Sequence, residues 1–348
     1  MKPQPIEQQR NALPTSDEAV PALKQVHLSW CSRLLTWFMR RVLRPMLGWG
    51  IHGSYQRIAR IQLFLASRRC KHTFGLPLDY CVVGRVPGHV VGKLTDTHKA
   101  AVLYLHGGAF ILPAVPEVHV TMLARICRDL DAVGFMVDYR LAPYNKFPAA
   151  LDDCERGYRA LLDLGFSPSR IVIAGESAGG ALTLGVLQRI RKASLPMPCC
   201  AVPISPVTEM GRIHAPPSRA MKMHTDPILP IAALQRVDEM YAGDWDASDP
   251  ELSPLYADLK GFPPLFLLAS DSEVLLDDTV LFARRAREAG IPTKLEVWPV
   301  LPHAFPLFEP YFPEVKQARL DITAFMRQHV STVLPLPARG ERSARSAG

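Results

Sequence analysis

The strongest candidate for chemistry is the run 170-RIVIAGESAGGALTLGVLQ-188, which contains the pattern G-x-S-x-G from Gly175 to Gly179. An apolar stretch precedes the pattern and a helical stretch follows it, which is the context that an exposed nucleophilic serine requires. Small flanking residues let the two backbones approach closely, so the hydroxyl of Ser177 projects above the end of a sheet. The amide of Ala178, at the helix start, would face negative charge that develops on an attacked carbonyl. The pattern therefore predicts a serine nucleophile for acyl transfer.

A second motif, 106-HGGA-109, follows another apolar run. Paired glycines at a strand end let the main chain approach a ligand and present amides instead of side chains. Acyl transfer needs at least two donors aimed at the tetrahedral oxyanion, each contributing about 3–4 kcal/mol to lowering the barrier. We expect the amides of Gly107 and Gly108, with that of Ala178, to form this oxyanion hole. His106 is interpreted as a brace for the loop and not as a catalytic base.

Together with 137-VDYRLAPYNKFPAALDD-153 and 253-SPLYADLKGFPPLFLLAS-270, the two motifs resemble the hormone-sensitive-lipase-like branch (family IV) of the α/β-hydrolase serine esterases. The resemblance covers residues 75–330. It implies an α/β-hydrolase fold: a mostly parallel eight-stranded sheet, helices on both faces and a helical cap. The chain departs from the usual pattern at Ala109, where a third glycine is common, and at Glu176, where aspartate is common. We interpret the position of Glu176 as structural.

In this fold an acidic residue and then a histidine follow the serine along the chain. His303 lies in the loop 298-WPVLPHAFPLF-308, after an apolar run, where the fold has its base. A neutral imidazole takes the serine proton, and a carboxylate orients the imidazole and stabilises its protonated form. His224 falls in an insertion and is interpreted as a cap residue.

The acid must come from 268-LASDSEVLLDD-278, where Asp271, Glu273, Asp277 and Asp278 compete. Asp271 is nearest to the preceding strand, and the last two fall in the first turn of an expected helix, where acids favour the helix dipole. The family's usual stretch, Asp-Pro-Leu-x-Asp-Glu, aligns with EVLLDD and implies that Glu273 takes the catalytic position. Asp271 remains the alternative. No metal site is expected in this cluster, because hard cations need several oxygen ligands and no further ligands can be named.

Short apolar runs alternate with helical stretches from residue 76 onward, which predicts a mostly parallel sheet with helices on both faces. Residues 206–250 interrupt this alternation with Pro, Met and His, and are interpreted as an insertion. The expected strands are 101–105, 132–139, 170–174, 199–205, 264–269 and 293–298, and the expected helices are 117–130, 149–164, 178–192, 276–289 and 314–330.

We divide the chain into three parts. Residues 1–75 are expected to hold a mobile N-terminus and a helical cap segment. Residues 76–334 form the catalytic domain, with a cap insertion at about 206–245, and residues 335–348 are a disordered tail. In the family this cap covers the acyl and alcohol pockets. Candidates for an apolar lining are Trp30, Trp37, Met221, Met223 and Trp245.

The formal net charge of +7 is unevenly distributed. Residues 1–72 hold twelve Lys and Arg but three Asp and Glu, a net charge of +9, so the rest of the chain sums to −2. Two interpretations of residues 26–70 compete: amphipathic helices that cover the main domain, or a helix lying in a membrane interface with its arginines toward lipid phosphates. No nucleic-acid-reading motif accompanies the charge, so nucleic acid is not an expected partner.

The seven cysteines are irregularly spaced and form no C-x-x-C pair, which favours reduced thiols in a cytoplasmic protein. The first twenty residues lack the apolar core of a secretory signal. No run approaches the ~18 uninterrupted apolar residues that a membrane-spanning helix needs. We therefore expect a cytoplasmic protein, with peripheral membrane contact through its basic N-terminal segment as a further hypothesis.

These residues predict a cofactor-independent carboxylic ester hydrolase that forms an acyl-enzyme on Ser177, with His303 as base and Glu273 as acid. The resemblance implies short to medium acyl chains, and it allows a homodimer that pairs through the last strand and helix. The alternatives are an amidase or deacetylase and a membrane-associated lipase, both with the same triad. A non-catalytic binding protein is disfavoured, because the chain retains both the serine and the histidine.

Overall fold

The computed structural model describes residues 22–70, 72–210 and 216–330. The expected disordered tail at 335–348 and most of the expected mobile N-terminus lie outside these residues. Within them, eight strands form one sheet in the order β1-β2-β4-β3-β5-β6-β7-β8. The strands are β1 (Leu78–Val83), β2 (Val86–Val91), β3 (Ala100–Leu105), β4 (Ala132–Val137), β5 (Ile171–Glu176), β6 (Cys200–Ile204), β7 (Leu265–Ser270) and β8 (Thr293–Trp298).

The sheet is parallel from β4 to β8, and β1 and β2 join its other edge as an antiparallel hairpin. The mostly parallel eight-stranded sheet is thus confirmed. The hairpin itself escaped the sequence pattern, because the first expected strand began at residue 101. Most of β1 is exposed and β2 contains Pro87 and Gly88, so neither strand resembles the buried apolar runs of the central sheet. The turn that joins the two strands is made by Gly84 and Arg85, both at positive φ.

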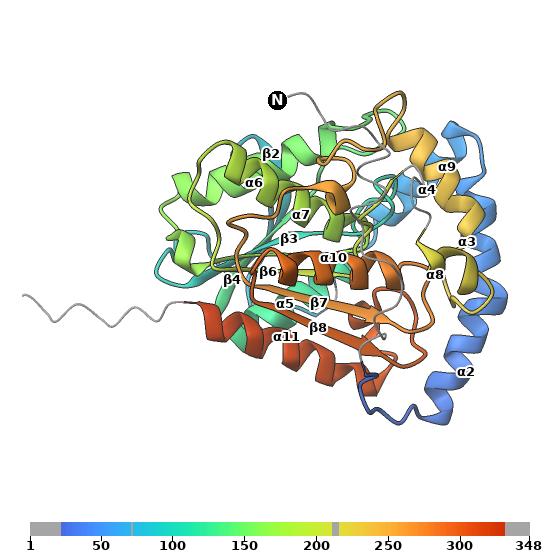
Figure 1. The fold of residues 1–348 in the computed structure, drawn as a ribbon. Coiled ribbons are helices and arrows are strands. Elements are labelled where there is room, and N and C mark those ends of the chain that lie inside the picture. The colour runs from blue at the N-terminus through green and yellow to red at the C-terminus, as the bar shows by residue number, and fades with distance from the viewer. Residues whose placement is uncertain (1–21, 71, 211–215, 331–348) are drawn as a thin grey trace, which may run out of the picture.

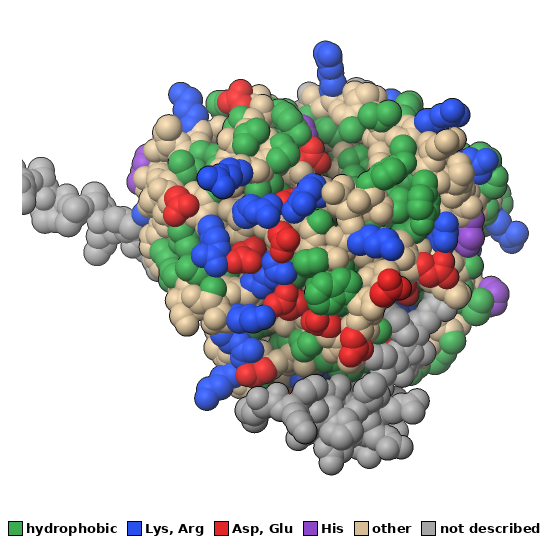
Figure 2. Space-filling model, turned by 90° about the horizontal axis from the view of Figure 1, so that it is seen from above, with side chains coloured by type: hydrophobic (Ala, Val, Ile, Leu, Met, Phe, Trp, Pro, Cys, Tyr) green, Lys and Arg blue, Asp and Glu red, His purple; other side chains and the backbone are tan. Residues whose placement is uncertain are grey.

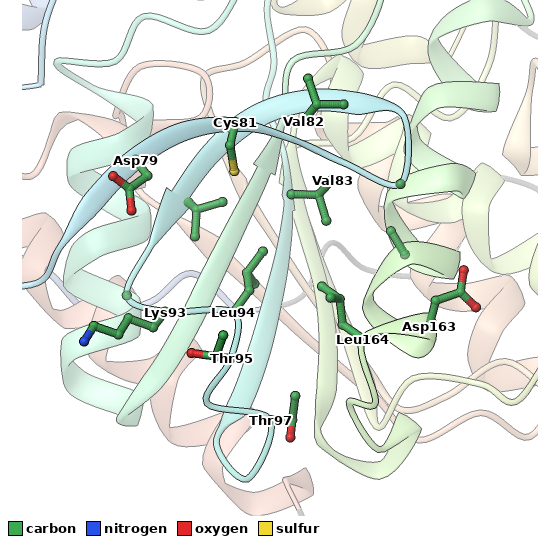
Figure 3. A pocket seen from close by; sticks show the side chains of 14 residues that line it. Asp79, Cys81, Val82, Val83, Lys93, Leu94, Thr95, Thr97, Asp163 and Leu164 are labelled. Atoms are coloured by element: carbon green, nitrogen blue, oxygen red, sulfur yellow. The ribbon is translucent and has the colours of Figure 1, made fainter.

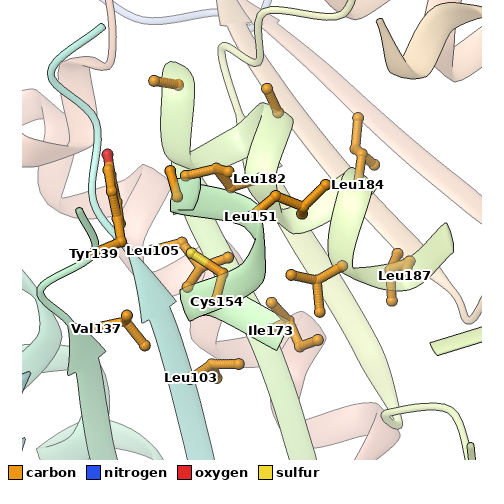
Figure 4. Close-up of a cluster of buried hydrophobic side chains, with 14 of the residues drawn as sticks. Leu103, Leu105, Val137, Tyr139, Leu151, Cys154, Ile173, Leu182, Leu184 and Leu187 are labelled. Carbon is orange, nitrogen blue, oxygen red and sulfur yellow. The ribbon is translucent and has the colours of Figure 1, made fainter. Parts of the chain in front are cut away.

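Helices cover both faces of the sheet (Figure 1). The side chains of α6, α7 and α10 share one hydrophobic core with the sheet, and those of α5 and α11 share a second core on the opposite face. Figure 4 shows part of the first core, where Leu103 and Ile173 of the sheet lie beside Leu151 of α6 and Leu187 of α7. These helices are α5 (His119–Leu130), α6 (Ala149–Asp163), α7 (Ala178–Lys192), α10 (Leu276–Glu288) and α11 (Lys316–His329).

The remaining helices lie together at the right of Figure 1, beyond one end of the strands. They come from two distant parts of the chain, the N-terminal segment and the insertion, and α3 contacts α9. We call this group the cap. Its helices are α2 (Trp30–Phe38), the π-helix η1 (Met39–Leu43), α3 (Arg44–Ile51), α4 (Tyr55–Ala66), α8 (Pro217–Met221) and α9 (Ile231–Tyr241). Short 3-10 turns complete the chain at Pro168–Arg170, Pro254–Tyr256, Phe305–Phe308 and Pro313–Val315.

Two acidic residues of α10 fasten the insertion to the catalytic domain. Asp277 and Asp278 do lie in the first turn of α10, as the sequence predicted. The carboxylate of Asp277 accepts a hydrogen bond from the amide of Ser218 at 2.7 Å. Buried Asp278 binds the guanidinium of Arg219 with two hydrogen bonds, of 2.8 and 3.1 Å, and accepts from the amide of Thr208 at 3.0 Å. Because a paired buried charge holds its partner in one geometry, this cluster fixes the base of α8.

The outer edge of β8 carries a contact that bears on dimer formation. Leu23 forms an isolated parallel bridge with Val297, and the amide of Lys24 donates to Val297 O at 2.8 Å. The ammonium of Lys24 lies 3.1 Å from Glu296 and 2.8 Å from Asp321 of α11. A homodimer through β8 stays a prediction, and it would have to displace this segment or pair beside it.

Candidate active site

Ser177 sits at the turn between β5 and α7, with φ 56° and ψ −119°. The turn is tight because glycines border it. A Cβ on Gly179 would overlap the carbonyl oxygen of Leu105, and a Cβ on Gly175 would overlap the carbonyl oxygen of Gly179. This is the strand–turn–helix geometry that the G-x-S-x-G pattern predicts, and it holds the serine in a conformation that non-glycine residues rarely adopt.

The loop after β3 lies against this serine, since a Cβ on Gly107 would be 3.2 Å from the Cβ of Ser177. The three predicted oxyanion donors are not equivalent, however. The amide of Gly107 donates a hydrogen bond to the carboxylate of Glu176, which corrects the expectation of three free donors. The amides of Gly108 and Ala178 have no acceptor in the described part of the chain. The same is true of Ala109, a donor that the sequence reasoning did not consider.

Glu176 fixes the position of this loop from beneath. Its carboxylate is buried and accepts from the hydroxyl of Tyr104 at 2.6 Å, in addition to the amide of Gly107. The same carboxylate lies 3.1 Å from Nε2 of His119. Because contacts with β3 and α5 hold the carboxylate in place, its bond to Gly107 anchors the loop, and the remaining amides of the loop are preorganised for an oxyanion. The structural interpretation of Glu176 agrees with these contacts.

His106 is buried at the start of the same loop. Its ring stacks on Tyr139 at 4.2 Å between centroids, and Nδ1 donates to Gly107 O at 2.6 Å. Burial and the nearby ring of His119 lower the pKa of His106 to about 3. The imidazole therefore stays neutral at physiological pH. These contacts agree with its interpretation as a brace.

The carboxylate that faces the imidazole of His303 is that of Glu273. Oε2 of Glu273 lies 2.6 Å from Nδ1 of His303, and both side chains are buried. The other oxygen of Glu273 accepts from the hydroxyl of Ser205 at 2.9 Å and from the amide of Ser270 at 2.8 Å. A carboxylate held at both oxygens fixes the ring and places the Nδ1 proton, which leaves Nε2 as the basic nitrogen.

Asp271, the alternative acid, lies elsewhere. Its side chain is 32% exposed and pairs with the ammonium of Lys222 in the cap at 3.2 Å. The reason is the turn after β7, in which the amide of Asp271 bonds to Trp298 O and that of Glu273 to Ser270 O. Although the two residues are only two positions apart, the carboxylate of Glu273 points inward and that of Asp271 points outward.

Nε2 of His303 is buried and has no hydrogen-bond partner in the described part of the chain. His303 and Ser177 border the same cavity, a space of about 180 Å³ that the loop from Gly107 to Phe110 also lines. A buried ring nitrogen without a partner carries a desolvation cost, which a proton from a nearby hydroxyl would offset. Among the residues that line this cavity, Ser177 is the one with a hydroxyl group.

Burial acts to lower the pKa of His303, whereas the hydrogen bond and charge of Glu273 and the charge of Asp226 act to raise it. The net result is a pKa raised above its ordinary value of 6.5. Asp226 is a contribution that the sequence reasoning missed. This buried residue of the insertion accepts from the amides of Ile228 and Leu229 at 2.8 Å and from that of Val274 at 2.9 Å. It thereby ties the cap to the loop that carries Glu273.

The cavity wall comes from both the catalytic domain and the cap. The aromatic and methionine side chains suggested as lining do not border it, which corrects that expectation. Trp30, Trp37, Met221 and Trp245 are instead exposed. His224 lies on the cap surface, as expected for a cap residue. The cap residues that do line the cavity are Leu47, Ile51, Ile228, Leu229, Pro230, Leu234, Val237 and Asp238.

A larger hollow, of about 880 Å³, lies under the β1–β2 hairpin at the other edge of the sheet (Figure 3). It is lined by Val83, Leu94 and Leu164, among others, and by none of the predicted site residues. Within the described ranges, no group of three or more His, Cys, Asp or Glu could hold a metal ion, and no helix has the length and apolarity to cross a membrane.

Comparison with known proteins agrees with this geometry. A family described as having the alpha/beta hydrolase fold matches residues 102–307, which include Ser177, Glu273 and His303. The chain belongs to the α/β-hydrolase fold family. An acetyl-hydrolase of Streptomyces hygroscopicus is 35% identical over 76% of this chain and 88% of its own length. Esterase LipU of Mycobacterium tuberculosis is 33% identical over 82% and 98%. An ethyl acetate hydrolase of Pseudomonas putida is 29% identical over 66% and 74%.

Solved structures place the chain more closely within this family. An esterase from the bacterial hormone-sensitive lipase family superposes with a TM-score of 0.77 at 30% identity, over 88% of this chain and 100% of that one. The esterase EstE5, soaked with p-nitrophenyl butyrate, gives a TM-score of 0.77 at 32% identity, over 86% and 99%. The resemblance to the hormone-sensitive-lipase-like branch is confirmed, and this α/β-hydrolase is a carboxylic ester hydrolase.

Proposed function

We propose that this enzyme hydrolyses short- to medium-chain acyl esters through an acyl-enzyme on Ser177, with a preference for the short end of that range. The observation that carries the proposal is the buried imidazole of His303. One ring nitrogen is bound to Glu273, and the other is left without a partner at the cavity that Ser177 shares. A side chain arranged in this way can take a proton from the serine and return it to a leaving group.

In the first half-reaction, Nε2 of His303 takes the proton of Ser177 as its hydroxyl oxygen attacks the ester carbonyl. The carboxylate of Glu273 stabilises the imidazolium that forms. The oxyanion accepts hydrogen bonds from the amides of Gly108 and Ala178, with that of Ala109 as the third donor in place of Gly107. When the tetrahedral intermediate breaks down, His303 protonates the departing alcohol and the acyl group stays on Ser177.

In the second half-reaction, water enters the position that the alcohol has left. His303 removes a proton from this water as it attacks the acyl carbonyl, and the same amides bind the second oxyanion. His303 then protonates the oxygen of Ser177, and the free acid departs. The residues of this chain supply every proton transfer in the cycle.

The size and lining of the cavity support the preference for short chains. Its volume of about 180 Å³ is below the ~300–1,000 Å³ of sites that enclose drug-sized ligands. Apolar side chains of the cap close it, among them Leu47, Ile228 and Leu234. The names of two relatives, acetyl-hydrolase and ethyl acetate hydrolase, indicate small acyl groups for those proteins.

A panel of p-nitrophenyl esters tests this preference. We expect kcat/KM to be highest for the acetate or butyrate and to fall by about tenfold or more toward the laurate, because each excess methylene must displace packed cap side chains. The rates are measured against a Ser177→Ala blank, which subtracts uncatalysed hydrolysis. A kcat/KM that rises steadily to the laurate would favour the lipase alternative. Faster cleavage of a matched nitroanilide than of the ester would favour the amidase alternative.

A further inference from the structure

The outer face of α2, η1 and α3 exposes large apolar side chains along its whole length. The side chain of Trp30 is 74% exposed and that of Trp49 is 66% exposed. Single exposed hydrophobic residues are ordinary, but a continuous row of them marks an interaction surface. We call this row the aromatic face, and it consists of Trp30, Leu34, Trp37, Phe38, Val42, Met46 and Trp49.

The amphipathicity of α2 is inverted relative to an ordinary surface helix, whose apolar side faces the core. The buried residues of α2 are Ser32 and Thr36. The hydroxyl of Ser32 donates to the carboxylate of Glu314 at 2.8 Å, and that of Thr36 donates to Ser32 O at 2.8 Å. The bond from Ser32 to Glu314 and the partly buried side chain of Leu35 dock this helix onto the protein, and its two tryptophans are directed to the surface.

The π-helix η1 keeps the aromatic face in register. An α-helix turns by about 100° per residue, so Trp30 and Trp49 would lie about 100° apart on an unbroken α-helix. The amide of Arg44 bonds to Met39 O, five residues back, which inserts one extra residue into the turn and cancels that offset. The physical cause is Pro45, which has no N–H to donate and whose ring would clash with the carbonyl of Arg41.

The charge within the segment that carries the aromatic face is of one sign. Residues 22–70 contain nine Lys and Arg and no Asp or Glu. The guanidinium of Arg40 donates to Thr225 O, and that of Arg44 to Met223 O. Arg33 and Arg41 are exposed and make no ion pair within the described part of the chain. In Figure 2, the right-hand edge of the molecule, on the side where α3 and α4 lie in Figure 1, shows basic, histidine and hydrophobic side chains.

We propose that the aromatic face binds the surface of an anionic lipid bilayer. Tryptophan and aliphatic side chains enter the boundary between headgroups and acyl chains, and flanking arginines pair with lipid phosphates. A second copy of this face is a poorer match, because residues 22–70 contain basic and no acidic side chains, and two such segments repel each other. On α3, the residues Leu47 and Ile51 line the Ser177 cavity. If the proposed function holds, the bound bilayer lies next to the cap helix that closes the cavity.

Co-sedimentation with vesicles tests the proposal on the full chain. We expect the protein to pellet with phosphatidylcholine vesicles that contain phosphatidylglycerol, and to pellet much less with pure phosphatidylcholine. The affinity of the double variant Trp30→Ser/Trp49→Ser for these vesicles should be lower by about tenfold or more. The double variant Arg33→Gln/Arg41→Gln should lose most of the dependence of binding on salt concentration. Tyr144→Ser is the matched control, because Tyr144 is 64% exposed but lies on the catalytic domain.

The readout is binding, so it does not depend on whether Ser177 catalyses hydrolysis. Both double variants should keep the wild-type kcat/KM for p-nitrophenyl acetate, because none of the four residues borders the cavity. Both should stay folded, because all four side chains are exposed, and circular dichroism checks this. Absence of binding by the wild type, or binding that Trp30→Ser/Trp49→Ser leaves unchanged, would overturn the proposal. The proposal would also be overturned if the wild type is a dimer, and if this double variant is a monomer with unchanged vesicle binding. The aromatic face would then be an interface between two copies of the chain.

Discussion

Replacing Ser177 with alanine is expected to lower kcat for p-nitrophenyl butyrate by about 10⁶-fold. The variant keeps the oxyanion amides and the cavity, but it has no oxygen that could form an acyl-enzyme. The backbone strain at this turn is the same for alanine as for serine, since both residues carry a Cβ at φ 56°. The fold should therefore survive, which circular dichroism and the melting temperature check.

Ser169→Ala is a matched control for this substitution. Ser169 is exposed in the turn before β5, and its hydroxyl contacts that of Ser167. Its loss should leave kcat unchanged. Wild-type activity in the Ser177→Ala protein would show that Ser177 is not the nucleophile and forms no acyl-enzyme.

Glu273→Gln is expected to lower kcat by about 10⁴-fold, whereas Asp271→Asn should leave it within about threefold. Glutamine has the shape of glutamate but not its charge, and its amide can no longer hold the Nδ1 proton of His303 and stabilise the imidazolium. The carboxylate of Glu273 has 0% side-chain exposure, so neither water nor salt can replace that charge. Asp271 already pairs with Lys222 in the cap and lies away from the imidazole.

The pH profile distinguishes this role from a merely structural one. Only the neutral imidazole accepts a proton, so activity falls as the pH drops below the pKa of His303. That pKa is raised, so the acidic limb of kcat/KM in the wild type should lie above pH 6.5. Without the charge of Glu273, burial dominates and the limb of the residual activity should move to lower pH. A larger loss of kcat in Asp271→Asn than in Glu273→Gln would reverse the assignment.

The parts of the site that could be predicted from the sequence depend on short-range patterns. The turn at Ser177 needs only a strand, small residues and a helix, all within one stretch of chain. The position of His303 follows from chain order once the fold is known. Glu273 was separable from Asp271 only by alignment with the family pattern, because spacing alone favours neither of two carboxylates in the same turn.

The remaining parts depend on contacts between distant residues. The bond between the amide of Gly107 and Glu176 joins positions 69 residues apart, and the bond between Asp226 and Val274 joins positions 48 residues apart. Local composition carries no record of either contact. The prediction of the cavity lining from the cap sequence is wrong for another reason. Tryptophan is most often packed inward, so the sequence favours Trp37 as cavity lining, whereas polar Thr36 of the same helix turn is the buried residue.

Mapping a covalent adduct shows directly which residue carries the acyl group, which we assign to Ser177. The wild-type enzyme is inactivated with a p-nitrophenyl alkylphosphonate, whose tetrahedral phosphorus mimics the intermediate, and its peptides are analysed by mass spectrometry. We predict one phosphonyl group per chain, on the peptide that contains Ser177, with release of one equivalent of nitrophenol. If the loss of activity accompanies modification of a different residue, or if inactivation is complete with Ser177 unmodified, Ser177 does not carry the acyl group.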